Sequence, residues 1–313
     1  MSEVDALMQI IAAANDVTAS LNLALSSNDS DLISSVTAIL EQKTIALENA
    51  SNLLDTAVPS TQVFSLNASD GTISMTDSVS GKSTVIINGL VLPKAMTLSP
   101  DGQSLYVCVV NSDIVAYYLD PLTGSWKKNP GFSYKSSNDV YPGGLIVIGN
   151  YLYITNNSRN SNCINVIDAG TGKVLLNPVT NFVNFPLASG LNVPTAIISD
   201  GTHIYVANTG EFNTGSTISR MNIDGSDLKL EWVKGLLGPT QMAIHDSSLY
   251  VVNGPFLQDN NTVVQIDIAD KDAPVVVGPL KNPDGSVRSF QKAIGLVIVD
   301  NKLIVIDRAG NTL

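Results

Sequence analysis

The sequence of 313 residues predicts an all-β propeller preceded by an N-terminal α-helical hairpin. The first observation is a repeated frame, in which an apolar strand ending in Asn or Asp recurs at steps of 44 to 54 residues. The second is that no helical pattern separates the strands, which excludes the parallel α/β folds. The third is that all 23 glycines lie beyond residue 58. We therefore divide the chain into a helical segment, residues 1–58, and a propeller, residues 59–313.

Residues 1–58 predict two consecutive amphipathic helices. Apolar side chains recur on alternating four- and three-residue steps, the pattern of a helix with one apolar stripe. The stripe comprises Val4, Leu7, Ile11, Ala14, Thr18, Leu21 and Leu25 in the first helix and Ile33, Val36, Leu40, Leu47, Ala50 and Leu54 in the second. Residues 26–30 (SSNDS) interrupt the pattern and supply N-cap residues, and Pro59 ends the second helix. Two roles stay open: local packing, or self-association and docking to a larger assembly.

Each repeat is recognised by a strand that ends in Asn or Asp. Residues 204–208 (IYVAN) and 249–253 (LYVVN) show the pattern in two consecutive repeats. The closing residues are Asn67, Asn111, Asn156, Asn208, Asn253 and Asp307, at steps of 44, 45, 52, 45 and 54 residues. An apolar strand that opens near Pro or Gly precedes five of them, joined by a polar turn such as 200–202 (DGT). With a third and a fourth strand after the closing residue, each repeat is one propeller blade.

We expect six blade-like units, with a closing unit that is incomplete or shared by both ends of the chain. The first repeat lacks an opening strand, and the last stops at residues 310–313 (GNTL), where 71–73 (GTI) would continue. The closing region is therefore expected from residues 61–89 and 292–313, because joining the ends removes an exposed sheet edge. Either one blade is short or the native chain runs past Leu313. An open arc of blades with a bare edge would contradict this expectation.

The repeats resemble a known family of propellers. Residues 205–208 (YVAN), 250–253 (YVVN), 99–102 (SPDG) and 168–173 (DAGTGK) are similar to the YVTN and NHL classes of β-propeller repeat, over about residues 60–313. The resemblance implies the blade type. It implies no single activity, because such propellers serve as enzymes, ligand binders and assembly modules.

Charge and composition exclude several classes of function. The net charge is −11 and no basic stripe occurs, which argues against nucleic acid and anionic membranes as partners. We also expect no membrane insertion and no cleaved signal peptide, because residues 1–5 (MSEVD) are acidic and no run of about 18 apolar residues follows. The chain is thus expected to be soluble, in a compartment that the sequence leaves open. Cys108 and Cys163 could pair, or could be small buried strand residues.

Aromatic residues gather in the predicted loops. The loops after the second and fourth strands share one face of a propeller, and here they are long: residues 127–141, 177–193, 254–261 and 281–291. Aromatic loops suit stacking on sugars or anchoring of a protein, although the same side chains could pack locally. The candidate partner-binding residues are Trp126, Phe132, Tyr134, Tyr141, Phe182, Phe185, Phe212, Phe256, Arg288 and Phe290.

An enzymatic alternative comes from another resemblance. Lactonase and gluconolactonase-like six-bladed propellers hold calcium over the central channel with Glu, Asn and Asp side chains, which implies oxygen ligands here. The positions that could converge are Asn156, Asn208, Glu211, Asn253 and Asp307. The competing interpretation is that the recurring Asn caps its loop by bonding to the backbone. His203 and His245 fall in turns, and neither a Ser-His-Asp nor a Cys-His system is supported.

Our leading hypothesis is a non-enzymatic propeller, without a cofactor, that binds a protein or glycan partner through its loop face. Residues 1–58 would make it a homo-oligomer or attach it to a larger assembly. Surface adhesins and virion fibres or spikes are built in this way, by analogy. The alternative is a calcium-dependent lactonase or gluconolactonase-like hydrolase.

Overall fold

The protein is described by a computed structural model, which places residues 61–109, 113–135, 142–158, 161–174, 188–211, 215–254 and 261–307. The chain divides into two compact units, Met1–Ser60 and Thr61–Leu313. The predicted helical hairpin of residues 1–58 lies outside the described residues. All regular elements of the described part are strands, which confirms the all-β prediction for this region.

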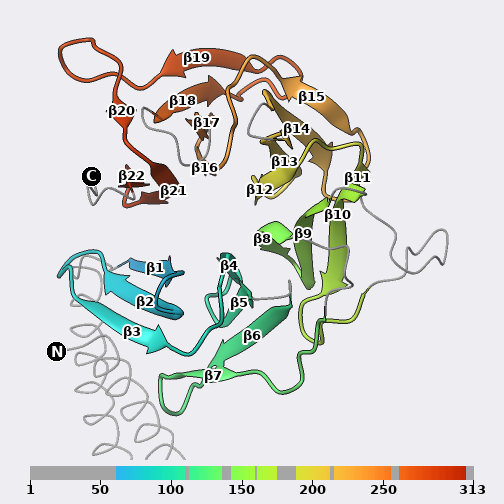
Figure 1. Cartoon of the computed structure of the whole chain (residues 1–313), viewed down its shortest axis with the longest axis vertical. Coiled ribbons are helices and arrows are strands. Elements are labelled where there is room, and N and C mark those ends of the chain that lie inside the picture. The colour runs from blue at the N-terminus through green and yellow to red at the C-terminus, as the bar shows by residue number, and fades with distance from the viewer. Residues whose placement is uncertain are drawn as a thin grey trace, which may run out of the picture. The chain divides into compact units, whose positions relative to one another are not determined.

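Four sheets follow one another along the chain, and each is built from consecutive antiparallel strands (Figure 1). The first contains β4 (Ala95–Leu98), β5 (Ser104–Cys108), β6 (Ile114–Leu119) and β7 (Trp126–Lys128). The second contains β8 (Pro142–Ile148), β9 (Tyr151–Ser158), β10 (Ser161–Asp168) and β11 (Ala188–Ser189). The third contains β12 (Pro194–Ser199), β13 (His203–Asn208), β14 (Thr217–Asn222) and β15 (Lys229–Val233). The fourth contains β16 (Met242–His245), β17 (Ser248–Asn253), β18 (Asn261–Asp267) and β19 (Val275–Pro279), and β20 (Ser289–Phe290) also pairs with β18.

These sheets are the blades of a propeller. Their first strands neighbour one another in succession, since β4 contacts β8, β8 contacts β12, and β12 contacts β16. Figure 1 shows the sheets of residues 61–307 standing around a ring with these strands innermost. β13 and β17 end at the closing Asn, as the repeat frame predicts, and β9 runs two residues past Asn156. β5 ends at Cys108, and its closing residue Asn111 lies outside the described residues. The β-propeller is therefore confirmed.

The two ends of the described chain form smaller sheets. One contains β1 (Gln62–Asn67), β2 (Thr72–Asp77) and β3 (Ser83–Ile87), and the other contains β21 (Ala293–Val299) and β22 (Lys302–Asp307). Five described sheets thus have three or more strands and count as blades, and β21–β22 is a hairpin. The predicted six blades are not confirmed.

Closure of the ring follows the expected regions only in part. The Asp300 carboxylate, in the β21–β22 turn, accepts hydrogen bonds from Thr61 Oγ1 (2.8 Å) and Ser78 Oγ (3.2 Å). The two end regions therefore meet, at residues within the predicted segments. Among the described residues, however, no ladder of backbone bonds joins β22 to β1, so the shared-sheet closure stays a prediction.

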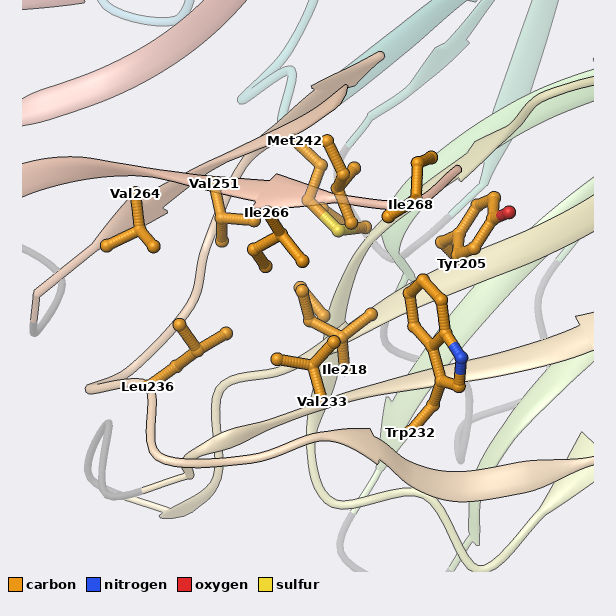
Figure 2. Packing of buried hydrophobic residues seen from close by; sticks show 13 residues of the cluster. Tyr205, Ile218, Trp232, Val233, Leu236, Met242, Val251, Val264, Ile266 and Ile268 are labelled. Atoms are coloured by element: carbon orange, nitrogen blue, oxygen red, sulfur yellow. The ribbon is translucent and has the colours of Figure 1, made fainter. Parts of the chain in front are cut away.

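The hydrophobic core lies between neighbouring blades. The cluster in Figure 2 joins Tyr205, Ile218 and Trp232 of the third blade to residues of the fourth, among them Val251 and Ile266. Four of these five side chains are completely buried, and Trp232 nearly so. Burying a large apolar side chain contributes about 1.5–3 kcal/mol, so packing between blades is a main source of stability.

Close approach of the inner strands explains one sequence feature. Gly143 and Gly144 of β8 face the backbone of β12, where a Cβ on Gly143 would lie 2.6 Å from the Pro194 carbonyl oxygen. Only glycine leaves room for two backbones at this distance. The paired glycines thus allow the second and third blades to pack side by side.

Two further expectations concern the cysteines and the membrane. Cys108 and Cys163 are buried and no disulfide joins them, which agrees with the interpretation as small strand residues. No helix in the part of the chain that the structure describes is long and apolar enough to cross a membrane.

Candidate functional site

The closing residue of a repeat accepts a backbone hydrogen bond from the segment that leads into its own blade. Asn208 Oδ1 accepts the N–H of Asn192 (3.3 Å), 16 residues earlier. Asn253 Oδ1 accepts the N–H of Leu237 (2.6 Å), also 16 residues earlier. In the last repeat the two carboxylate oxygens of Asp307 accept the N–H groups of Gln291 (2.9 Å) and Lys292 (2.8 Å). We call this repeated contact the closing-residue latch.

The amide nitrogen of the same side chain reaches the third strand. Asn208 Nδ2 donates to Thr217 Oγ1 (3.1 Å) and Ser219 Oγ (2.8 Å) at the start of β14. Asn67 Nδ2 makes the equivalent bonds to Thr72 Oγ1 (3.0 Å) and Ser74 Oγ (3.1 Å) on β2. An asparagine can donate and accept at once, so it ties the blade entry to the third strand. At Asn67 and Asn208 these bonds agree with the interpretation that the recurring Asn holds its own blade together.

The latch involves most of the candidate calcium ligands. Asn156, Asn208 and Asp307 are buried, Asn253 is half-buried and Glu211 is exposed. The side-chain oxygens of Asn208, Asn253 and Asp307 each accept a backbone N–H, and a calcium ion would compete with those bonds. Within the described ranges, no three His, Cys, Asp or Glu side chains are grouped as a metal site would need.

The described aromatic candidates pack against neighbours. The Trp126 ring stands edge-on to Phe64 at 5.9 Å, and the Phe132 ring does so to Tyr106 at 5.6 Å. Phe132 and Tyr134 belong to the core between the first two complete blades, so they lie inside the fold and not on an exposed loop face.

A second pair of candidates lies beside the β20 segment. The half-buried Arg288 places its guanidinium 5.9 Å from the ring centre of Phe290, which is itself buried. Arg288 and Trp126 are thus the half-buried members among the described candidates, whereas Phe132, Tyr134 and Phe290 are buried. The remaining candidates, Tyr141, Phe182, Phe185, Phe212 and Phe256, lie outside the described residues, and partner binding by the set stays a prediction.

A polar network between the third and fourth blades was not predicted from the sequence. The Lys271 ammonium pairs with Asp200 Oδ2 (2.9 Å), which also accepts the Tyr205 hydroxyl (2.8 Å). The Lys271 carbonyl accepts Trp232 Nε1 (2.7 Å) and Arg220 Nη1 (2.6 Å). The loop between β18 and β19 is thereby bound to the neighbouring blade. The sequence indicated only that Asp200 lies in a turn. It did not indicate the ion pair, because Lys271 is 71 residues farther along the chain.

This network shifts two pKa values in opposite directions. Burial by itself would raise the pKa of Asp200. Hydrogen bonds from Lys271 and from the backbone of His203 and Thr202 outweigh burial and hold this pKa well below its usual range. Burial, followed by the hydrogen bond to Asp200 and the charge of Asp200, raises the pKa of Tyr205. At neutral pH the pair is therefore a carboxylate and a neutral phenol.

Nucleophilic chemistry at the buried thiol is disfavoured. Burial raises the pKa of Cys108 to about 11, and burial likewise raises the pKa of the nearby Tyr134 to about 12. A reactive cysteine needs a thiolate, which this environment suppresses at neutral pH.

Comparisons with known proteins support the fold alone. No protein-family model and no curated protein matches the chain, so the YVTN or NHL repeat type stays a resemblance. Among solved structures, hydrazine synthase of Kuenenia stuttgartiensis is similar at 17% identity with a TM-score of 0.56, over 79% of this chain and 71% of that chain. A structural genomics protein of unknown function from Bacteroides thetaiotaomicron is similar at 15% identity with a TM-score of 0.55, over 82% of this chain and 66% of that one. At such identities the likeness carries the propeller architecture and no activity.

Proposed function

We propose that the chain is a non-enzymatic β-propeller module that recognises a protein or glycan partner through its loop face. The observation that carries this proposal is the closing-residue latch. The recurring polar side chains, which in the alternative would hold calcium, bond to the backbone of their own blades. The closing residues therefore stabilise the blades, and the loops between the blades, which differ from repeat to repeat, are the surface that suits a partner.

The loop of residues 281–291 is the described loop that best fits this role. An isolated antiparallel β-bridge between Lys281 and Val287 closes a turn at residues 282–286. Asp284 Oδ1 accepts the Ser286 N–H (2.9 Å) in that turn, and Val287 is exposed to 49%. Arg288 lies at its base, above the Phe290 ring. A cation and an exposed apolar side chain on a braced loop suit contact with a partner.

The test of the binding role is a glycan array together with capture of protein partners by the full chain. A loop variant in which residues 282–287 are replaced by Gly and Ser serves as the specificity control. We expect the full chain to retain a defined glycan or protein that this variant, or an equivalent variant of another loop, loses. Binding that no loop replacement changes would contradict the loop-face proposal.

The alternative is a calcium-dependent lactonase or gluconolactonase-like hydrolase. It is favoured by the oxygen chemistry of Asn208, Asn253 and Asp307, whose types suit calcium. Metal analysis with a lactone-hydrolysis assay separates the two functions. Stoichiometric calcium, with turnover that Asn253→Ala abolishes, would overturn the binding-module proposal.

Attachment through residues 1–58 is a separate part of the proposal. The apolar stripe of that segment would mediate self-association or docking to a larger assembly, such as a surface or virion fibre or spike. The test is sedimentation of the full chain carrying Leu21→Glu and Leu47→Glu on the stripe, with Gln9→Glu beside it as the control. We expect the stripe variants to dissociate and the control to stay assembled. A parent chain that is already a monomer would contradict self-association.

A further inference from the structure

The chain contains two Asn-Gly pairs, Asn88-Gly89 and Asn253-Gly254. At such a pair an asparagine can lose its side-chain amide, because the backbone nitrogen of the next residue attacks the amide carbon. Glycine in the second position favours the attack, since it has no Cβ to obstruct the approach and leaves the backbone free to adapt. The two dipeptides are identical, so the structure around each pair decides which one can react in the folded protein.

Asn88 and Gly89 form an exposed link between two anchored residues. Ile87, the last residue of β3, is buried, and so is Leu90, whose N–H donates to the Gly71 carbonyl oxygen (2.9 Å). Asn88 and Gly89 are both exposed and lie outside any strand, and Gly89 has a φ of 74° with open space where a Cβ would be. Within the part of the chain that the structure describes, no hydrogen bond holds the Asn88 amide or the Gly89 N–H. Both reacting groups are therefore accessible to each other.

The second pair is held at both reacting groups. The Gly254 N–H, which carries the nitrogen that would attack, donates to the Leu237 carbonyl oxygen (2.6 Å). The side chain that would be attacked is held as well, because Asn253 Oδ1 accepts the Leu237 N–H (2.6 Å). Gly254 is also buried. Local opening must break both bonds before this pair can react, so the fold protects Asn253.

Only one of three equivalent segments carries the reactive pair. Asn88-Gly89 follows β3 and precedes a leucine, as Ser189-Gly190 does after β11 and Lys234-Gly235 does after β15. Neither a serine nor a lysine side chain has an amide carbon that the next nitrogen could attack. The chemistry is thus confined to the segment that leads from the sheet of β1–β3 to the sheet of β4–β7.

We propose that Asn88-Gly89 is a site of spontaneous deamidation in the folded protein. The Gly89 nitrogen bonds to Asn88 Cγ, the bond from Cγ to Nδ2 breaks, and Nδ2 leaves as ammonia with the proton of the Gly89 nitrogen. The product is a five-membered succinimide ring. Water then opens the ring at either carbonyl carbon and gives aspartate or isoaspartate, in which the backbone runs through the former side chain. The sequence of steps consumes one water, releases one ammonia and needs no oxidant or enzyme.

The fold can accommodate either product. Each adds one negative charge at neutral pH, in a protein whose net charge is already −11. Isoaspartate also lengthens the backbone by one carbon atom between Ile87 and Leu90, where both intervening residues are exposed. The modified protein should therefore stay folded while the loop at residues 88–89 becomes more acidic with time. This inference goes beyond the proposed function and does not depend on it.

The test incubates the full chain at neutral and at mildly alkaline pH and follows both pairs by peptide mapping with mass spectrometry. Electron-transfer fragmentation distinguishes isoaspartate from aspartate, and water enriched in oxygen-18 labels the newly formed carboxylate. Since two hydrogen bonds protect Asn253, we expect Asn88 to convert at least about tenfold faster. Conversion at Asn88 should be faster at the higher pH, where the attacking nitrogen loses its proton more readily, and isoaspartate should be among the products.

Unfolding in urea is the matched control. Without the fold the two Asn-Gly pairs should react at similar rates, because the bonds to Leu237 are gone. Asn88→Ala should remove the acidic species that isoelectric focusing detects in the aged parent protein. Equal rates at Asn88 and Asn253 in the folded chain, absence of isoaspartate at residue 88, or a rate difference that persists in urea would each overturn the proposal.

Discussion

Replacing Asn208 with Ala tests whether the closing residues hold the fold or bind a metal. The side chain is 2% exposed and makes three described hydrogen bonds, one accepted from Asn192 and two donated to Thr217 and Ser219. A buried hydrogen bond contributes about 1 kcal/mol, so the loss should be about 3 kcal/mol. For a domain of this size that corresponds to a melting temperature lower by roughly 6–12 °C.

The assay is thermal unfolding followed by circular dichroism, in a chelator and again with added calcium. Asn222→Ala is the control in the same blade, because its side chain makes one exposed bond to Ser226 Oγ (2.8 Å). That variant should change stability by less than about 0.5 kcal/mol. The structural role predicts the full loss for Asn208→Ala under both conditions. A variant as stable as the parent in chelator, with a deficit only in calcium, would refute the latch and favour a metal ligand.

Three further predictions concern the contacts between blades. Lys271→Met should cost about 1 kcal/mol at neutral pH. Because the folded pKa of Asp200 is lowered, its stabilisation exists above the usual carboxyl pKa and is lost as the pH falls, so the two urea-unfolding curves should converge in acid. Tyr205→Phe should reduce the loss of stability above about pH 10. The pKa of this phenol is raised in the folded state, so above about pH 10 the unfolded phenol ionises first and favours unfolding, which Phe cannot do. Parallel alkaline profiles of the two proteins would contradict this. Gly143→Ala should cost about 1–3 kcal/mol in thermal melts through overlap with the backbone of β12, whereas Gly131→Ala, which meets only a flexible side chain, should be nearly neutral.

The repeat frame was predictable because its causes are local. Period-2 apolar patterns and turns such as residues 200–202 depend on neighbours within one hairpin, and β12–β13 formed where they were expected. The latch could also be anticipated, because a recurring Asn at the end of a strand is typical of a side chain that bonds to backbone. What periodicity did not reveal was its partner, the N–H group 16 residues earlier.

The candidate site was less predictable, because burial depends on contacts between blades. In the sequence, Phe132 and Phe290 cannot be told from exposed loop aromatics. In the structure both lie in the core, where neighbouring blades cover them. The network of Asp200, Lys271 and Arg220 joins positions that no local pattern relates. Its members are ordinary turn and strand residues until two blades pack together.

The sequence by itself determined the antiparallel strands, the closing residues and the propeller architecture, since each follows from patterns that repeat within about 50 residues. The tertiary structure decided which aromatic side chains are buried, which charges meet across blades and which of the two Asn-Gly pairs is held by hydrogen bonds. The physical reason is that local preferences specify a strand and its two faces. Only the packing of complete blades determines what covers each face and each edge.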